Sequence, residues 1–139
     1  MTKRVAIAEL EGAALDWAVA TSTGLPVYDM ESDWPGIRAI NEAARHGPVI
    51  IFNLVRRLFI EDQDGSRAYS PTTDWSQCGP LIERYKIAIM GPNPTDDYWT
   101  AWAGPMKDGP TPLIAACRAI VAAHSPSGFV EVPDELAHG

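Results

Sequence analysis

The stretch from Tyr69 to Arg84 carries the densest set of side chains that could bind a ligand. It combines the aromatic rings of Tyr69 and Trp75 with the hydrogen-bonding groups of Asp74 and Gln77. Rings beside donors and acceptors suit a planar polar ligand such as a nucleobase. They equally suit a loop that is held down by its own caps and rings. The pattern therefore leaves a ligand site and a structural role open.

A second group of residues could bind an anion. Helix N-termini favour anions because their free N–H groups and the macrodipole point the same way. The run from Gly109 to Pro112 predicts such a helix start. Arg118 follows Thr111 by seven positions and so lies on nearly the same side of that helix. Gly109, Thr111 and Arg118 could therefore converge on one anionic group.

Three carboxylates, those of Asp16, Asp74 and Glu83, could act in acid–base catalysis. Such a carboxylate would need a pKa that is raised by burial. Asp16 belongs to a segment that is apolar over most of its helical circumference. It either points to solvent through the remaining gap, or it is a buried acid that pairs with an arginine or faces a site. Pairing of Arg118 with Asp16 or Glu83 would instead lock the core.

The sequence contains no common cofactor or metal motif. It lacks GxGxxG, GxxxxGK[ST], HExxH and GxSxG. His46, His124 and His138 are scattered, so we expect neither a metal site nor a cofactor. Cys78 and Cys117 form no CxxC, and we expect free thiols packed as small hydrophobic groups.

The composition is that of an acidic globular protein. The 139 residues fit one domain with a buried core, and 46% of them are hydrophobic. The net charge of −7 disfavours nucleic acid as a partner, because nucleic-acid affinity depends on phosphate neutralisation. No apolar run approaches the ~18 residues of a membrane span, and the N-terminus lacks a signal-peptide pattern. We therefore expect a cytoplasmic protein without a membrane partner.

Apolar periodicity predicts helices at residues 10–21, 35–46, 75–85 and 112–124. Gly79-Pro80 is expected to divide the third of these into two short helices. Thr73 or Asp74 is its expected N-cap, and Thr111 is the expected N-cap of the last helix.

Short β-forming runs predict strands at residues 5–7, 49–60, 66–69, 87–90, 98–102 and 129–132. The run at 49–60 is either one bent strand or two short ones, and its irregular alternation predicts cover on both faces. Residues 26–34 and 104–110 are expected to be loops. Together these elements predict one α+β domain over residues 1–139, with a small mixed or antiparallel sheet packed by helices.

Three stretches, in this order, resemble the NinX-like family of phage and prophage proteins. They are Leu15-Asp16-Trp17-Ala18-Val19-Ala20, Tyr69 to Ile87, and Gly109 to Arg118. The family pattern reads LDWAVA, STDWxQGGPIIERExI and GPTPLIAAMR, followed by a segment similar to residues 130–136. The departures are Thr72 for serine, Cys78 for glycine, Tyr85 for glutamate and Cys117 for methionine. Residues 26–66 match no part of the pattern and are interpreted as a variable insertion-like segment, and residues 137–139 as a loose tail.

The resemblance implies a phage or prophage origin, action in the bacterial host cytoplasm, and a single site built from the three motifs. Our leading hypothesis is therefore an accessory protein that binds a small anionic or nucleotide-like ligand. The residues expected to bind it are Asp16, Trp17, Tyr69, Thr73, Asp74, Trp75, Gln77, Glu83, Arg84, Gly109, Thr111 and Arg118. The alternatives are a factor that acts on a host protein and an acid–base enzyme. A homo-oligomer stays open.

Overall fold

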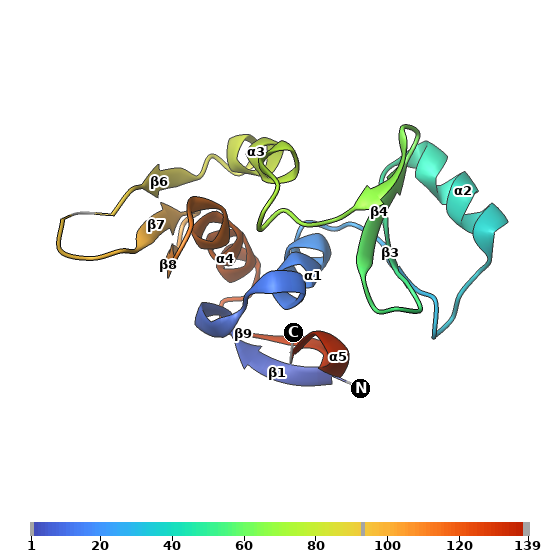
Figure 1. Ribbon diagram of the computed structural model, residues 1–139, viewed down its shortest axis with the longest axis horizontal. Helices are drawn as coiled ribbons and strands as arrows, with labels where there is room; N and C mark the ends of the chain where they lie inside the picture. Colours follow the sequence, from blue (N-terminus) through green and yellow to red (C-terminus); the bar gives the residue numbers. More distant parts are fainter. Residues whose placement is uncertain (1, 93, 138–139) are drawn as a thin grey trace.

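Helices α1 (Gly12–Ser22) and α4 (Pro112–His124) form the centre of the molecule, and three separate sheets surround them (Figure 1). The computed structural model describes residues 2–92 and 94–137. It confirms the α+β class, and it divides the strands among three sheets where the sequence predicted one. Within the described residues, no helix is long and apolar enough to cross a membrane.

Helix α4 has the predicted bounds. The Oγ1 atom of Thr111 accepts a hydrogen bond from the backbone N–H of Ile114 at 3.1 Å, and Pro112 occupies the first turn. This confirms the predicted N-cap. The helix is buried on nearly every side because its stripe of Leu113, Cys117 and Ile120 is backed by alanines that admit neighbouring backbone closely.

One face of α4 is covered by an antiparallel sheet of β6 (Ala88–Met90), β7 (Trp99–Trp102) and β8 (Met106–Gly109). Strand β8 lies in the segment that was expected to be a loop, so that expectation was wrong. Its sequence of methionine, lysine, aspartate and glycine has little β propensity. The strand forms because β7 pairs with it in register, from Trp99 opposite Gly109 to Trp102 opposite Met106.

Gly109 permits a close approach between this sheet and α4. A Cβ atom at Gly109 would lie 2.7 Å from the backbone nitrogen of Ala115.

We therefore expect Gly109→Ala to lower the free energy of unfolding by about 2 kcal/mol, because the backbone has to move to admit the methyl group. Gly79→Ala is the matched control, since a Cβ atom there meets nothing within 4 Å. Chemical denaturation should show the control equal to the parent or more stable by about 0.5–1 kcal/mol. Equal stability of Gly109→Ala and the parent would contradict the expected clash.

Residues 26–68 form the second part of the molecule (Figure 1). Strands β2 (Val27–Asp29), β3 (Val49–Phe52), β4 (Leu58–Asp62) and β5 (Gly65–Ala68) pair in that order, with β2 parallel to β3. The run at 49–60 is thus two strands, one of the alternatives that were expected. Strand β2 corrects the expectation that residues 26–34 are a loop.

Helix α2 (Ile37–His46) covers one face of this sheet, and the main core covers the other. On β3, Ile50 and Phe52 join the main core, whereas Val49 and Ile51 pack with Ile40 of α2. Every residue of β3 is buried for this reason. The predicted cover on both faces is confirmed.

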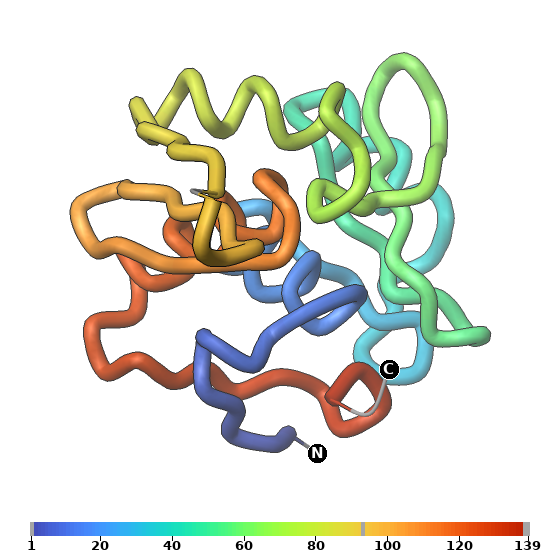
Figure 2. The backbone as a smooth tube through the Cα atoms, turned by 60° about the vertical axis from the view of Figure 1, so that its left-hand side comes forward, coloured from blue at the N-terminus to red at the C-terminus, as the bar shows by residue number. Residues whose placement is uncertain are grey.

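The first and last strands of the chain lie side by side (Figure 2). Strand β1 (Thr2–Ala6) pairs antiparallel with β9 (Phe129–Pro133), and a 3₁₀ turn η1 (Ile7–Glu9) leads into α1. A single turn α5 (Asp134–Ala137) follows β9. The predicted loose tail comprised residues 137–139. Ala137 is instead the last residue of α5, and residues 138–139 lie outside the described residues.

Candidate functional site

Helix α3 (Trp75–Arg84) positions most of the stretch in which a site was predicted. Asp74 is the N-cap of this helix, which was one of the two predicted alternatives. Its Oδ1 atom accepts hydrogen bonds from the N–H of Ser76 at 2.9 Å and from the Ser76 hydroxyl at 2.6 Å. These bonds lower the pKa of Asp74. The expected division at Gly79-Pro80 was wrong, because α3 is one helix with Pro80 inside it. Pro80 leaves one intrahelical hydrogen bond unmade, and packing retains the helix despite that loss.

Asp16 on α1 is buried and is bound by the second motif. Its Oδ1 atom accepts a hydrogen bond from the backbone N–H of Thr72 at 3.0 Å, and the residue is 4% exposed. Burial raises the pKa of Asp16 to about 6, and hydrogen bonds from Thr72 and Ser70 oppose part of that rise. Among the alternatives, a solvent-facing Asp16 was wrong. The acid is buried, and its bonded partner is Thr72 and not an arginine.

The three motifs meet in the core around Asp16. The hydroxyl of Tyr69 is buried without a hydrogen-bond partner among the described residues, and burial, reinforced by Asp16, raises the pKa of Tyr69. The Sγ atoms of Cys78 and Cys117 lie 3.9 Å apart, and both thiols are free and buried, as expected. We call Asp16, Tyr69, Cys78 and Cys117 the core cluster. It joins α1, α3, α4 and the segment before α3.

A cavity of about 300 Å³ lies between α3 and the strands β4 and β5. We call it the α3 cavity. Its lining residues are Thr23, Leu25, Pro48, Ile60, Asp62, Arg67, Tyr69, Ser76, Gln77, Leu81 and Arg84. Three predicted site residues thus share one cavity, namely Tyr69, Gln77 and Arg84.

Gln77 fixes α3 to the chain that follows β5. Its Oε1 atom accepts a hydrogen bond from the N–H of Ser70 at 2.6 Å, and its Nε2 atom donates one to the carbonyl oxygen of Ala68 at 2.7 Å. The side chain therefore shapes the cavity wall and has few bonding positions left for a ligand.

Arg67 is a cavity residue that was not predicted from the sequence. It lies two positions before Tyr69 at the end of a predicted strand, so the alternation of side chains places both on one face. That spacing was the available signal. Arg67 donates to both carboxylate oxygens of Asp62, at 3.0 and 3.2 Å, and these bonds lower the pKa of Asp62.

Gly109 and Arg118 line a different cavity, of about 550 Å³, together with Tyr98, Met106 and Lys107. Arg118 pairs with neither Asp16 nor Glu83. Its Nε atom donates to the carbonyl oxygen of Leu10 at 3.0 Å, and its Nη1 atom donates to that of Asp108 at 2.9 Å. The side chain clamps the start of α1 to β8 across α4, and burial lowers the pKa of Arg118.

The other predicted residues lie apart from the α3 cavity. Trp75 is 57% exposed on α3, and Glu83 is exposed on the same helix. Trp17 borders a third cavity, of about 510 Å³, near His124. The hydroxyl oxygen of Thr73 lies 2.6 Å from that of Ser70. The three motifs therefore meet in the core, and their predicted site residues open onto different cavities.

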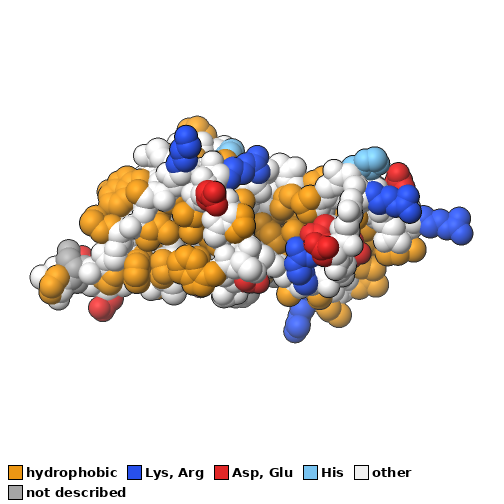
Figure 3. All heavy atoms as spheres, turned by 90° about the horizontal axis from the view of Figure 1, so that it is seen from above, with side chains coloured by type: hydrophobic (Ala, Val, Ile, Leu, Met, Phe, Trp, Pro, Cys, Tyr) orange, Lys and Arg blue, Asp and Glu red, His pale blue; other side chains and the backbone are white. Residues whose placement is uncertain are grey.

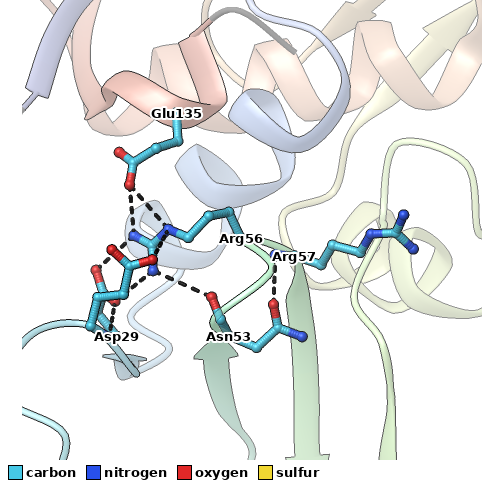
Figure 4. A network of polar contacts seen from close by, with 6 residues as sticks. Asp29, Asn53, Arg56, Arg57 and Glu135 are labelled. Atoms are coloured by element: carbon cyan, nitrogen blue, oxygen red, sulfur yellow. Dashed lines mark hydrogen bonds and ion pairs between the residues drawn. The ribbon is translucent and has the colours of Figure 1, made fainter.

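A polar network around Arg56 was not predicted from the sequence (Figure 4). Arg56 contacts both oxygens of Asp29 at 2.8 and 3.0 Å, Glu135 at 3.0 Å and Glu31 at 3.4 Å. Its guanidinium lies 3.5 Å from the ring centroid of Phe52. The hydrogen bonds from Arg56 lower the pKa of Asp29. The network ties β2 and the β3–β4 turn to α5, so its role is structural.

The described part of the chain holds no group of three His, Cys, Asp or Glu side chains that could bind a metal ion. Comparison with family models gives a match to the family described as Bacteriophage P22, NinX, over residues 6–124. The curated proteins contain no match to this chain.

Proposed function

The chain belongs to the phage NinX family, and from that premise we propose that it binds a small anionic ligand in the α3 cavity. The observation that carries the proposal is the lining of this cavity, where Arg67 and Arg84 stand beside an apolar wall. Its volume of about 300 Å³ lies at the lower end of the ~300–1,000 Å³ that is usual for small-molecule sites.

The charge of the lining favours an anion. Arg67, Arg84 and Asp62 give the cavity a formal charge of +1, on a chain with a net charge of −7. Arg67 and Asp62 satisfy each other. Arg84 forms no ion pair within the described residues, and its guanidinium lies 5.1 Å from the ring centroid of Tyr85. Arg84 is therefore the cation that is available to a carboxylate or phosphate group.

The apolar part of the lining selects the body of the ligand. Leu25, Ile60, Leu81 and Tyr69 contribute aliphatic and aromatic surface, and the Ser76 hydroxyl lies at the edge. A ligand with a planar or apolar body and one anionic group would bury its body against this wall and place its charge at Arg84. Nucleotides and related aromatic acids have this chemistry.

A thermal-shift screen tests the proposal. The panel holds nucleoside mono-, di- and triphosphates, cyclic dinucleotides and aromatic carboxylic acids. A bound ligand at 100 times its Kd should stabilise the protein by about 2.7 kcal/mol, which is a readily measured rise in the unfolding temperature. The proposal fails if no compound shifts the transition at millimolar concentration.

For a compound that binds, we expect Arg84→Ala to weaken the affinity about tenfold, because one charge-assisted hydrogen bond is worth about 1.4 kcal/mol. Lys107→Ala is the matched control, since Lys107 is a cation that lines the other cavity. Isothermal titration calorimetry measures both variants. Equal loss in the two variants would point to long-range charge, and loss confined to Lys107→Ala would move the site to the other cavity.

A protein–protein contact is the second candidate, because large apolar side chains are exposed on the outer face of the β6–β7–β8 sheet. Met90 and Met106 alternate away from the buried Ala101 and are 54% and 56% exposed, and Tyr98 beside them is 59% exposed. Hydrophobic side chains gather over this end of the molecule (Figure 3). An exposed apolar patch commonly marks an interaction surface. Retention of the same host protein by the parent and by a Met90→Lys, Met106→Lys variant would remove this candidate.

A further inference from the structure

Cys78 and Cys117 are neighbouring thiols on two different helices. They are separated by 39 positions in the chain, yet their Sγ atoms lie 3.9 Å apart in the core. A disulfide requires a distance of about 2.05 Å, so each sulfur has to move by only about 1 Å. We propose that Cys78 and Cys117 form a redox-sensitive link between α3 and α4 that alters the α3 cavity. The effect on the cavity's ligand rests on the proposed function, whereas formation of the link does not.

The link would form with a two-electron thiol oxidant, either a peroxide or a low-molecular-weight disulfide. With hydrogen peroxide, the Cys78 thiolate attacks one oxygen, the O–O bond breaks, and a sulfenic acid and water result. The Cys117 sulfur then attacks the sulfenic sulfur and expels the second oxygen as water, with the two thiol protons taken up by the two oxygens. Both sulfurs are oxidised, and one peroxide is reduced to two waters.

The environment of the two thiols assigns the first step to Cys78. The hydrogen bond from Cys117 lowers the pKa of the Cys78 thiol, and the same contact, together with burial, raises the pKa of Cys117. A lower thiol pKa gives more of the nucleophilic thiolate. Cys117 is then the resolving thiol.

Helix α3 is the element that can admit the oxidant. Both sulfurs are fully covered in the closed structure, so reaction requires local opening. Helix α4 lies at the centre of the molecule, whereas α3 packs on its outside and contains Pro80, which removes one backbone hydrogen bond. We therefore expect oxidation at the rate at which α3 opens.

The link would reach the cavity through α3. Cys78 follows Gln77, whose two short hydrogen bonds hold the chain at Ala68 and Ser70. Leu81 and Arg84, which lie one and two turns further along the helix, also line the cavity. A shift of Cys78 toward α4 moves these side chains together, because the helix is a rigid element.

The test exposes the parent, Cys78→Ala and Cys117→Ala to hydrogen peroxide or oxidised glutathione, followed by alkylation in denaturant. The parent should lose two mass units, resist alkylation and yield a crosslinked Cys78–Cys117 peptide. Neither variant should show any of these three changes. Reduction should reverse the change. We expect the link to raise the unfolding temperature of the parent by about 5–10 °C, because it closes a long loop in the unfolded chain.

If a variant fails to fold, the parent alone still tests the proposal, because the same chain is compared before and after reduction of the link. Sulfinic acid or glutathione adducts without a crosslinked peptide would overturn the link. A compound that binds the reduced protein should bind the linked protein at least threefold more weakly. Equal affinity of the reduced and the linked protein would overturn the effect on the cavity but not the formation of the link. If the link forms and no compound binds the reduced protein, the proposed function is contradicted instead.

Discussion

Replacing Arg56 with alanine is expected to lower the free energy of unfolding by about 2–3 kcal/mol. The Arg56 side chain is 17% exposed, and its guanidinium bonds to Asp29 through two nitrogens and contacts Glu135 through two. Truncation leaves Asp29, Glu31 and Glu135 close together without their cation, and the Phe52 ring loses its cover. The carboxylates that remain are 31–49% exposed, so water screens part of their repulsion, and the expected loss lies between that of an exposed and that of a buried ion pair.

Arg57→Ala is the matched control for this prediction. Its side chain points away from the network and is exposed (Figure 4). Its backbone N–H donates to the Asn53 side chain, its carbonyl oxygen accepts from the Asn53 N–H, and the substitution retains both groups. Urea denaturation at pH 7 should show Arg57→Ala within about 0.5 kcal/mol of the parent. Similar losses in the two variants would mean that the network does not stabilise the protein.

Asp16→Asn is expected to stabilise the protein at neutral pH by up to about 3 kcal/mol. The pKa of Asp16 rises from 3.8 to about 6 on folding, a shift of about 2 units, and each unit corresponds to about 1.4 kcal/mol. Above pH 6 the folded protein buries a carboxylate that the unfolded chain would leave in water. Asparagine is neutral, and its oxygen still accepts the hydrogen bond from Thr72.

The effect has a defined pH dependence. Between pH 3.8 and about 6 the folded state binds a proton that the unfolded state releases, so the contribution of Asp16 to stability falls as the pH rises through this window. The advantage of Asp16→Asn should therefore be largest at pH 7 and vanish near pH 4. Carboxylates with lowered pKa values, such as Asp29 and Asp62, act in the opposite direction at lower pH and cancel in the comparison of parent and variant. A difference that does not change with pH would contradict a buried titrating Asp16.

Local chemistry made part of this fold predictable. The proline after Thr111 and the apolar stripe behind it determine the start and extent of α4, and the side chain of Asp74 determines where α3 begins. These signals lie within a few residues of the structure that they create. The same holds for residues 49–60, where irregular alternation predicted cover on both faces.

What could not be predicted depends on partners that are distant in the chain. Strand β8 exists because β7 pairs with it, and α3 continues through Pro80 because packing outweighs one missing hydrogen bond. Arg118 bonds to backbone carbonyls, which carry no residue-specific signal. The candidate site shows the same division: Tyr69, Gln77 and Arg84 were identified from their own motif, while Ile60 and Leu25 are brought to the cavity by other elements.

The most direct test of ligand binding in the α3 cavity is a two-dimensional ¹H–¹⁵N NMR titration with the strongest compound from the screen. We predict saturable shifts at the backbone of Arg67, Ser76, Gln77 and Leu81, and at the side chain of Arg84, with little change at Lys107 and Asp108. Saturable shifts that centre on Lys107, Asp108 and Gly109, or an unchanged spectrum at saturating compound, would contradict a ligand site in the α3 cavity.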